Sequence, residues 1–243
     1  MAGHSKWKNI QHRKGAQDKK RGKIFTKIAT ELTVAAKLGG ADPESNPRLR
    51  LALAKGKAAN MPKDNIERAI KKGVGGGDTS DYTEKTYEGY GPGGVAFVVE
   101  CLTDNINRTV GNVRHAFTKY GGNLGTDGSV SWMFHKKGLV LVERSKVEDY
   151  DQMFEAVLDQ GTEDVKEEGD YYEITSAPED FQQLKEAVDQ LGLATEVAEI
   201  TRIPENYKEV EGQQSESVGK MVDILEDDDD VQNVYHNASF PDD

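Results

Sequence analysis

Cysteine is almost absent from this sequence, since Cys101 is the only one among 243 residues. One cysteine excludes an intramolecular disulfide and a cysteine-rich zinc site, and such usage is typical of a reducing compartment. Long apolar runs are missing as well: none approaches the roughly 18 residues that span a bilayer. The basic N-terminus has no apolar signal region. We therefore expect a cytoplasmic protein that has no contact with a membrane.

Recognisable catalytic and cofactor motifs are also lacking. The histidines show neither H-x-x-x-H nor H-E-x-x-H spacing, and no G-x-x-x-x-G-K-[ST] loop occurs. Residues 89–94 satisfy G-x-G-x-x-G, but Pro92 and the strand expected after it favour a turn between strands over a dinucleotide site. The same strand places Cys101 in a core, which favours a structural thiol over a nucleophile. We predict no catalysis, metal, cofactor or small-molecule substrate.

Negative charge dominates the composition, with 43 Asp and Glu against 31 Lys and Arg and a formal net charge of -12. The charge is unevenly spread along the chain. Residues 1–77 contain 18 Lys or Arg against 6 Asp or Glu, whereas residues 78–243 contain 13 against 37. A reversal of sign between two parts of one chain indicates a polyanion-binding part and a separate acidic body.

The stretch 1–23 carries eight Lys or Arg, the single acid Asp18, and Trp7. Cations position phosphates, and an indole gives an unpaired base a surface on which to stack. An exposed indole adds nothing to solubility, so this composition favours a nucleic-acid contact over a solubilising spacer. The expected contact residues are His4, Lys6, Trp7, Lys8, His12, Arg13, Lys14, Lys19, Lys20, Arg21, Lys23 and Lys27.

Two further charged segments allow a functional interpretation. Arg108, Asn112, His115 and Lys119 recur at steps of 4, 3 and 4 residues on the polar side of an expected helix. An ordinary solvated face is the favoured interpretation, and a secondary phosphate contact through Arg108, His115 and Lys119 is the alternative. The acidic run Glu226 to Asp230 is interpreted as a solvated helix end, because it lacks the turn of a calcium-binding loop.

Hydrophobic periodicity predicts three short helices in the basic part of the chain. We expect them to start near Lys19, Asn46 and Met61. The pair Gly39-Gly40 and Gly73 are expected to end the first and the third helix. The segment Gly73 to Asp81 has four glycines in its first five positions, which is typical of a flexible hinge. Residues 1–18 have few apolar side chains and are expected to form a mobile or partner-ordered tail.

Beyond the hinge the apolar pattern predicts strands mixed with helices. Strands are expected at 86–90, 95–102 and 129–134, and a helix at 106–120. Residues 137–203 follow the order β-α-β-β-α-β, which is the ferredoxin-like arrangement. The helix 218–225 and the strand 231–235 then have no sheet of their own, so we place them with the earlier strands.

The predicted fold class is therefore α+β multidomain. It has an N-terminal three-helix domain and two α+β (ferredoxin-like) domains, one inserted in the other. The predicted boundaries are 1–77 for the basic arm and helical domain, 82–135 with 205–243 for the split domain, and 136–204 for the inserted domain.

Several segments resemble the YebC family. The resemblance is carried by Ala2 to Trp7, Asn9-Ile10, His12 to Lys14, Asp18, Lys20-Arg21 and Lys23 to Lys27, and then by Tyr87 to Pro92, Glu100 to Thr109 and Val234 to Asn237. The resemblance implies a helical N-terminal domain followed by two α+β domains. It also implies a non-enzymatic, cytoplasmic regulator of gene expression.

The family resemblance implies competing functions. Its members are described as probable transcriptional regulators that bind DNA, its mitochondrial relatives look like translational activators, and bacterial members are linked to ribosomes stalled on proline-rich sequences. A mobile cationic arm with Trp7 suits irregular RNA, so we predict an RNA-associated translation factor on the ribosome. The helix from Lys19 could enter a major groove, so promoter DNA stays as the alternative partner.

Overall fold

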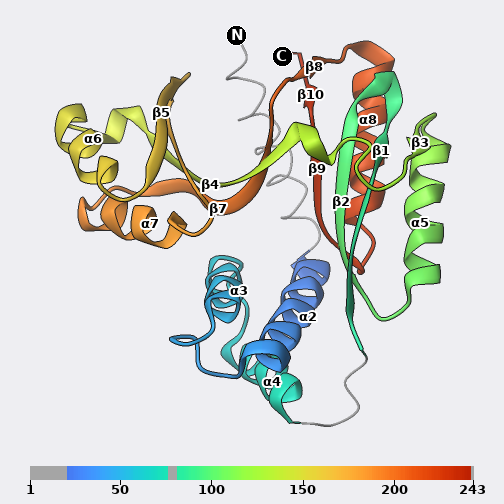
Figure 1. Ribbon diagram of the computed structural model, residues 1–243, viewed down its shortest axis with the longest axis horizontal. Coiled ribbons are helices and arrows are strands. Elements are labelled where there is room, and N and C mark those ends of the chain that lie inside the picture. Colours follow the sequence, from blue (N-terminus) through green and yellow to red (C-terminus); the bar gives the residue numbers. More distant parts are fainter. Residues whose placement is uncertain (1–20, 76–80, 242–243) are drawn as a thin grey trace. The chain divides into compact units, whose positions relative to one another are not determined.

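The computed structural model describes residues 21–75 and 81–241, except for the side chain of Arg21 (Figure 1). Among these residues, 132–207 form one compact unit, and the remainder forms a second. The predicted fold class is confirmed: a helical N-terminal domain precedes two α+β domains, one inserted in the other. The domain boundaries given above stay predictions.

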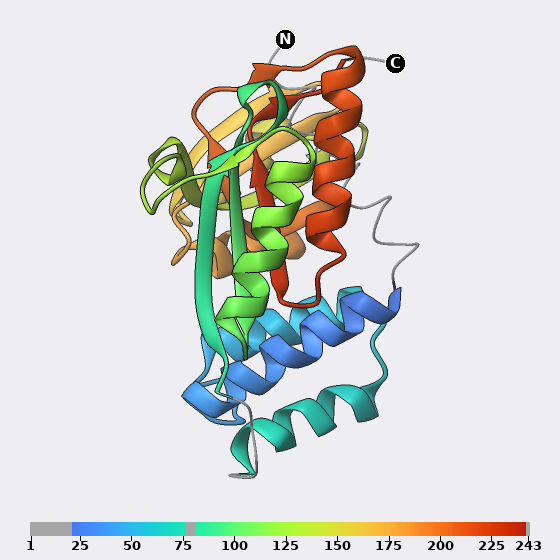
Figure 2. The ribbon, with the colours of Figure 1, turned by 90° about the vertical axis from the view of Figure 1, so that its right-hand side faces the viewer.

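The N-terminal domain consists of α2 (Arg21–Gly39), α3 (Pro47–Ala58) and α4 (Lys63–Val74). Both α3 and α4 pack on α2, and Figure 2 shows α4 running below α2. Leu32 of α2 and Leu49 of α3 are fully buried in the shared core. Burial of a leucine side chain stabilises a fold by about 1.5–3 kcal/mol, so apolar side chains spaced along α2 hold the three helices together.

Asn46 connects the end of α2 to the start of α3. Its side-chain oxygen accepts a hydrogen bond from the Leu49 amide at 3.0 Å, as expected of a helix cap. Its side-chain amide donates to the carbonyls of Ala35 and Gly40 at 2.8 and 2.9 Å. Gly40 adopts a φ of +85°, which is the left-handed helix stop that the sequence predicts.

Gly73 has a different role from the predicted helix stop. The helix α4 continues through Gly73 to Val74, and a Cβ atom at this position would collide with the carbonyl oxygen of Thr33. Gly73 therefore allows α4 to approach α2 closely. The rest of the predicted hinge includes residues 76–80, which lie outside the described residues.

The split domain contains β1 (Thr83–Tyr90), β2 (Ala96–Thr103), α5 (Ile106–Lys119), β3 (Asn123–Leu124), β8 (Lys208–Glu209), α8 (Gly212–Glu226), β9 (Val231–His236) and β10 (Ala238–Ser239). Its main sheet has the order β3-β1-β2-β9. The pairing of Val98 in β2 with Tyr235 in β9 confirms that the C-terminal strand returns to the earlier sheet. Figure 2 shows α5 and α8 side by side on one face of this sheet.

Aromatic and aliphatic side chains from four elements form the core of the split domain. Phe97 of β2, Phe117 of α5, Met221 of α8 and Val231 of β9 are all fully buried. The rings of Phe97 and Phe117 meet edge to face with centroids 5.9 Å apart. Burial of these side chains fixes α5 and α8 on the sheet, and this places the polar faces and ends of the two helices.

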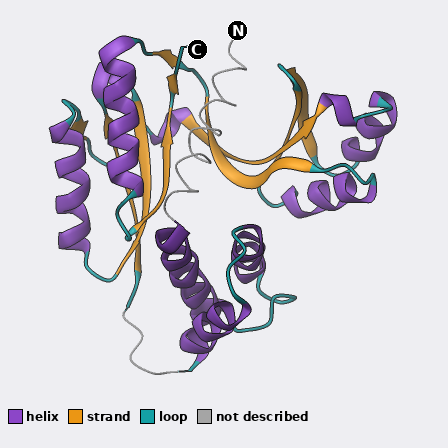
Figure 3. Ribbon diagram, turned by 180° about the vertical axis from the view of Figure 1, so that it is seen from behind, coloured by secondary structure: helices purple, strands orange, loops and turns teal. Residues whose placement is uncertain are grey.

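The inserted domain contains β4 (Phe134–Glu143), α6 (Tyr150–Leu158), β5 (Thr162–Glu168), β6 (Tyr171–Ser176), α7 (Phe181–Gln190) and β7 (Thr195–Pro204). Its strands form an antiparallel sheet with the order β5-β6-β4-β7. Figure 3 shows α6 and α7 packed together beside this sheet. This confirms the predicted ferredoxin-like order.

The strand predicted from Ser129 to Phe134 does not form as expected. Phe134 is the first residue of β4, and the residues before it form a bend and a 3₁₀ turn, Ser131–Met133. Three backbone amides in residues 128–131 donate to the side chain of Glu88. A donor that is used in this way cannot pair with a neighbouring strand, so β-forming residues in this segment do not join a sheet.

Candidate nucleic-acid interface

Most of the predicted contact residues lie outside the described residues. These are His4, Lys6, Trp7, Lys8, His12, Arg13, Lys14, Lys19 and Lys20, and the predicted tail over residues 1–18 lies there too. Arg21 is the first residue of α2, and nothing is described of its side chain. The structure places Lys23 and Lys27, which lie four residues apart on α2. Nucleic-acid contact by the whole set stays a prediction.

Lys23 and Lys27 both contact the C-terminal end of α8. The ammonium group of Lys23 donates to the carbonyl of Asp227 at 2.5 Å and lies 3.1 Å from its carboxylate. The ammonium group of Lys27 donates to the carbonyl of Glu226 at 2.6 Å. Carbonyls at a helix C-terminus carry partial negative charge, so cations stabilise this end. Two of the predicted phosphate contacts thus already have partners within the chain.

Lys27 is also the more enclosed of these two lysines. Burial lowers the pKa of its ammonium group below the usual lysine value, while the neighbouring charges of Glu226, Asp228 and Asp229 act in the opposite direction. The negative charges of the acidic segment beside Lys27 favour its charged form. Lys27 is therefore poorly placed to meet an external phosphate in this conformation.

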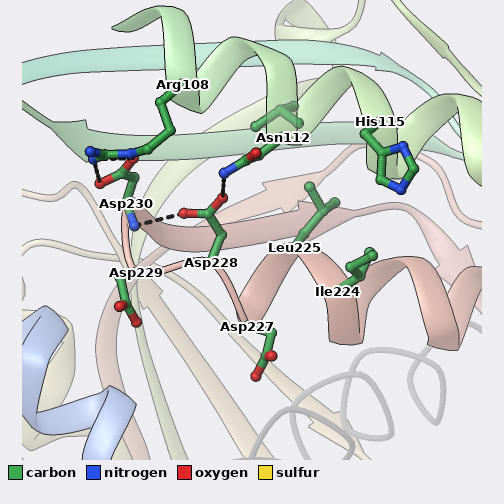
Figure 4. A pocket seen from close by; sticks show the side chains of 10 residues that line it. Arg108, Asn112, His115, Ile224, Leu225, Asp227, Asp228, Asp229 and Asp230 are labelled. Atoms are coloured by element: carbon green, nitrogen blue, oxygen red, sulfur yellow. Dashed lines mark hydrogen bonds and ion pairs between the residues drawn. The ribbon is translucent and has the colours of Figure 1, made fainter. Parts of the chain in front are cut away.

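The acidic run 226–230 is the predicted solvated helix end only in part, because α8 ends at Glu226 and Asp227 and Asp229 are exposed, whereas the last residue of the run is buried. Asp230 is only 7% exposed. Arg108 donates through Nε and Nη2 to its two carboxylate oxygens at 3.0 and 2.7 Å (Figure 4). The Thr109 hydroxyl donates to the same carboxylate at 2.8 Å. The helix α8 ends at Glu226, and the turn after it directs successive carboxylates toward different neighbours.

In the polar stripe on α5, the first two side chains pair with carboxylates of the acidic run and the last two are exposed. The guanidinium of Arg108 is held by Asp230, which raises the pKa of Arg108 above its usual value. The side-chain amide of Asn112 donates to Asp228 at 2.8 Å (Figure 4). His115 and Lys119 are exposed. The secondary phosphate contact stays a prediction, and it would require Arg108 to leave its carboxylate.

A pocket of about 590 Å³ lies between α5 and α8 beside this loop. Its lining consists of Arg108, Asn112, Val113, His115, Ile224, Leu225 and Asp227 to Asp230. In Figure 4 the His115 ring lies toward one end of the pocket and Asp230 toward the other. No hydrogen bond between His115 and a carboxylate is seen among the described residues, and these residues contain no group of three or more His, Cys, Asp or Glu arranged for a metal.

The other sequence motifs have structural roles. Residues 89–94 connect β1 to β2 through a 3₁₀ turn, Pro92–Gly94, so the predicted turn between strands is confirmed. Cys101 is 3% exposed, and burial raises the pKa of its thiol to about 12. A thiol with this pKa stays protonated at neutral pH, which agrees with the predicted structural role.

Glu88 is an organising residue that the sequence interpretation missed. It is 5% exposed and accepts hydrogen bonds from the amides of Gly128, Val130 and Ser131 at 2.6 to 2.8 Å. Burial acts to raise the pKa of Glu88, but these donors outweigh it and hold the pKa below its usual value. Its place within residues 87–92, which resemble a family signature, is the one sequence signal that could have marked it.

Two family models match this chain. The model described as TACO1/YebC protein N-terminal domain matches residues 5–76, and the model described as TACO1/YebC second and third domain matches residues 82–238. The chain belongs to the TACO1/YebC family. The resemblance seen in the sequence is thereby confirmed over nearly the whole chain.

Relatives within the TACO1/YebC family are similar over their full length. A probable transcriptional regulatory protein of Syntrophotalea carbinolica is 57% identical over 242 residues, which cover 100% of this chain and 97% of the relative. Another, from Desulforapulum autotrophicum, is 55% identical and is covered to 98%. The crystal structure of a conserved hypothetical protein from Aquifex aeolicus matches with a TM-score of 0.79 and 44% identity over 92% of each chain. Sequence and fold therefore agree on the family.

Within residues 21–75 and 81–241, none of the helices is both long and apolar enough to cross a bilayer.

Proposed function

We propose that this protein is a non-enzymatic, nucleic-acid-binding regulator of gene expression that acts on RNA at the ribosome and eases stalling on proline-rich sequences. The observation that carries the proposal is the charge distribution, with 18 Lys or Arg against 6 acids in residues 1–77 and 13 against 37 in the rest. Phosphate contacts supply much of the affinity for nucleic acid. They depend on charge within about 8–10 Å, so an acidic protein can bind a polyanion through one basic part.

The packing around α2 supports RNA, and not the major groove of DNA, as the binding partner. A helix that reads the major groove must present a free face and its base-contacting side chains to the DNA. In this protein α3 and α4 pack on α2, and Lys23 and Lys27 contact the end of α8. Basic residues before α2 are accompanied by Trp7, whose indole suits stacking on an unpaired base. Unpaired bases are common in folded RNA.

The names of the relatives favour a second candidate function. Several are called probable transcriptional regulatory proteins, and such a role would take promoter DNA as the partner. The two candidates share the phosphate backbone as ligand and differ in the molecule that carries it. The link to proline-rich stalling comes from the family resemblance alone.

The absence of enzymatic activity is part of the proposal. The buried, protonated thiol of Cys101 and the turn at residues 89–94 support it, because they remove two candidate sites. His115 lines the pocket beside several carboxylates, but no described hydrogen bond couples it to one of them. A general base is oriented by such a partner, so the pocket lacks that feature.

Crosslinking in living cells followed by sequencing of the bound nucleic acid tests the partner. We expect ribosomal RNA fragments to be enriched, and we expect the enrichment to fall when residues 2–18 are deleted. Enrichment of promoter DNA would support the second candidate. Recovery of neither nucleic acid above the level of an unrelated acidic protein would overturn both.

The positions of ribosomes on messenger RNA test the link to stalling. In cells without this protein, ribosome density at consecutive proline codons is expected to rise, and re-expression of the protein should restore it. Density that stays the same at these codons, while other messages change in abundance, would contradict the translation role and favour transcription.

A further inference from the structure

The cations of the helical domain fall into two groups when they are sorted by their partners. The first group is engaged within the chain. It contains Lys23 and Lys27 on the end of α8, Lys37 with Asp81, Arg48 with Glu31 and Glu84, and Arg50 with the carbonyls of Pro43 and Glu44. This group holds helices and strands in place and has little left to offer an external anion.

The second group has no ion pair or hydrogen bond through its side chains with any described residue. It consists of Lys55, Lys57, Arg68, Lys71 and Lys72, and all five side chains are exposed. They lie at the end of α3 and in the second half of α4, and these two segments are neighbours, since a Cβ atom on Gly56 would lie 3.4 Å from the side chain of Ile66. The only other cation of these two helices outside the first group, Lys63, lies 3.4 Å from Glu67.

The three cations of α4 share one exposed side of that helix. Arg68, Lys71 and Lys72 are three and four residues apart, a spacing that brings side chains together. Ala69 and Gly73, which directly follow Arg68 and Lys72 in sequence, are buried on another side of the helix. Like charges this close repel, and the dipole at the end of the helix offsets part of the repulsion. Their N–H donors stay open to an outside anion.

We propose that Lys55, Lys57, Arg68, Lys71 and Lys72 form a second phosphate-contacting surface, separate from the N-terminal arm, that binds the backbone of folded RNA. This inference rests on the proposed function, because it takes the same class of ligand. Ammonium and guanidinium groups match phosphate oxygens. Neither α3 nor α4 contains an aromatic residue, so this surface recognises backbone charge and not the identity of a base.

The two contact regions then have different tasks. The arm, with Trp7, supplies stacking and responds to unpaired bases, whereas the α3–α4 surface supplies sequence-independent attraction. Binding through this surface is expected to tolerate changes of RNA sequence and to weaken as salt increases.

Neutralisation of the α4 cations in the full-length protein tests the surface. The variant combines Arg68→Gln, Lys71→Gln and Lys72→Gln, because glutamine keeps helix propensity and removes charge. The matched control combines Lys166→Gln, Lys185→Gln and Lys220→Gln, three lysines that each pair with a nearby acid. Affinity for a folded RNA is measured against salt concentration, and thermal unfolding checks that both variants fold.

The expected result is a change of slope. Each lost phosphate contact reduces the magnitude of the slope of log K against log salt by about 0.7–0.9. The slope of the α4 variant should therefore be smaller in magnitude than the wild-type slope by about 2 to 3. The slope of the control should equal that of the wild type. A wild-type slope in the α4 variant overturns the surface while leaving the proposed function intact. Absence of binding by the wild-type protein to any nucleic acid overturns the proposed function itself.

A duplex DNA of matched length identifies the source of the phosphate. A larger loss of slope on RNA than on DNA supports RNA as the ligand of this surface. An equal loss on both supports a surface for phosphate backbones of either kind. A loss on DNA alone overturns the assignment to RNA.

Discussion

Two buried carboxylates, Glu88 and Asp230, hold loops of the split domain in place. Their exposed fractions are 5% and 7%. Three backbone amides donate to Glu88, while Arg108 and Thr109 donate to Asp230. A buried carboxylate is costly unless its oxygens are hydrogen-bonded. Changes that keep the shape of the side chain and remove its charge are therefore expected to destabilise the protein.

The substitution Glu88→Gln is expected to lower the free energy of unfolding by about 1–3 kcal/mol at pH 7, because at least one amide then faces an NH₂ donor. Denaturant unfolding measures the change. The control is Glu216→Gln on the exposed side of α8, for which a change within about 0.5 kcal/mol is expected. Equal effects of the two substitutions would contradict the role of Glu88.

The stability contributed by Glu88 should depend on pH. The folded state holds the pKa of Glu88 below its usual value of about 4.3, so its contribution is complete above that value. It is lost as the pH falls through the folded-state pKa. The difference in unfolding free energy between wild type and Glu88→Gln should be constant from pH 7 to about 5 and shrink below pH 4. A difference that grows with acidity would contradict this assignment.

Asp230 and Asp229 form a matched pair for substitution. Asp230→Asn removes the charge that pairs with Arg108, and because Arg108 keeps partial access to water we expect a loss of about 1–3 kcal/mol. Asp229 is exposed, so Asp229→Asn should change stability by less than about 0.5 kcal/mol. Thermal or denaturant unfolding of the two variants compares them directly, and similar losses would argue against a specific role for Asp230.

At the scale of elements, α2 and α8 are joined by lysines that cap a helix end. Lys23 and Lys27 of α2 donate to the carbonyls of Asp227 and Glu226 at the C-terminal end of α8, where helix carbonyls carry partial negative charge. This contact links the basic helical domain to the acidic split domain. It also gives a structural role to two lysines that the sequence predicts to contact phosphate.

The double substitution Lys23→Gln and Lys27→Gln separates these two tasks. If the lysines cap α8, the unfolding free energy should fall by about 1–2 kcal/mol, and the slope of RNA affinity against salt should stay that of the wild type. The same salt titration and an unfolding curve measure both quantities. A slope reduced in magnitude by more than about 1, with stability unchanged, would show that these lysines contact nucleic acid and do not stabilise the end of α8.

At the scale of the whole molecule, the chain separates its charges by sequence region. Residues 1–77 hold more than half of the Lys and Arg in about a third of the length. The arm adds Trp7 to this charge, and the predicted arm function depends on both features. The salt dependence of binding measures the contribution of the cations, and a preference for unpaired bases measures the contribution of the indole.

Deletion of residues 2–18 should reduce the slope of log K against log salt on single-stranded RNA by about 3, because the segment contains four Lys or Arg. Trp7→Ala should leave the slope nearly unchanged and weaken binding to a loop RNA more than to a duplex, since stacking contributes about 1–3 kcal/mol per base. Titrations with both RNAs measure these effects. Equal losses on loop and duplex would argue against stacking.

Much of the fold could be predicted because its signals are local. The helix stop at Gly40, the cap at Asn46 and the β-α-β-β-α-β order each depend on residues close together in sequence. The return of β9 to β2 followed from a helix and a strand that had no other sheet. By contrast, the predictions for the role of Gly73 and for a strand at 129–134 were wrong, because distant residues, Thr33 and Glu88, decide what happens there.

The candidate site could be predicted only in part. The sequence by itself determined the α+β class, the family resemblance and the concentration of positive charge in the first third of the chain, because these depend on composition and short-range pattern. Only the tertiary structure decided which charges are engaged. Lys23 and Asp227 are 204 residues apart and Arg108 and Asp230 are 122 apart, and no local periodicity encodes such pairs. Folding brings them together and leaves five cations of α3 and α4 exposed, Lys55, Lys57, Arg68, Lys71 and Lys72.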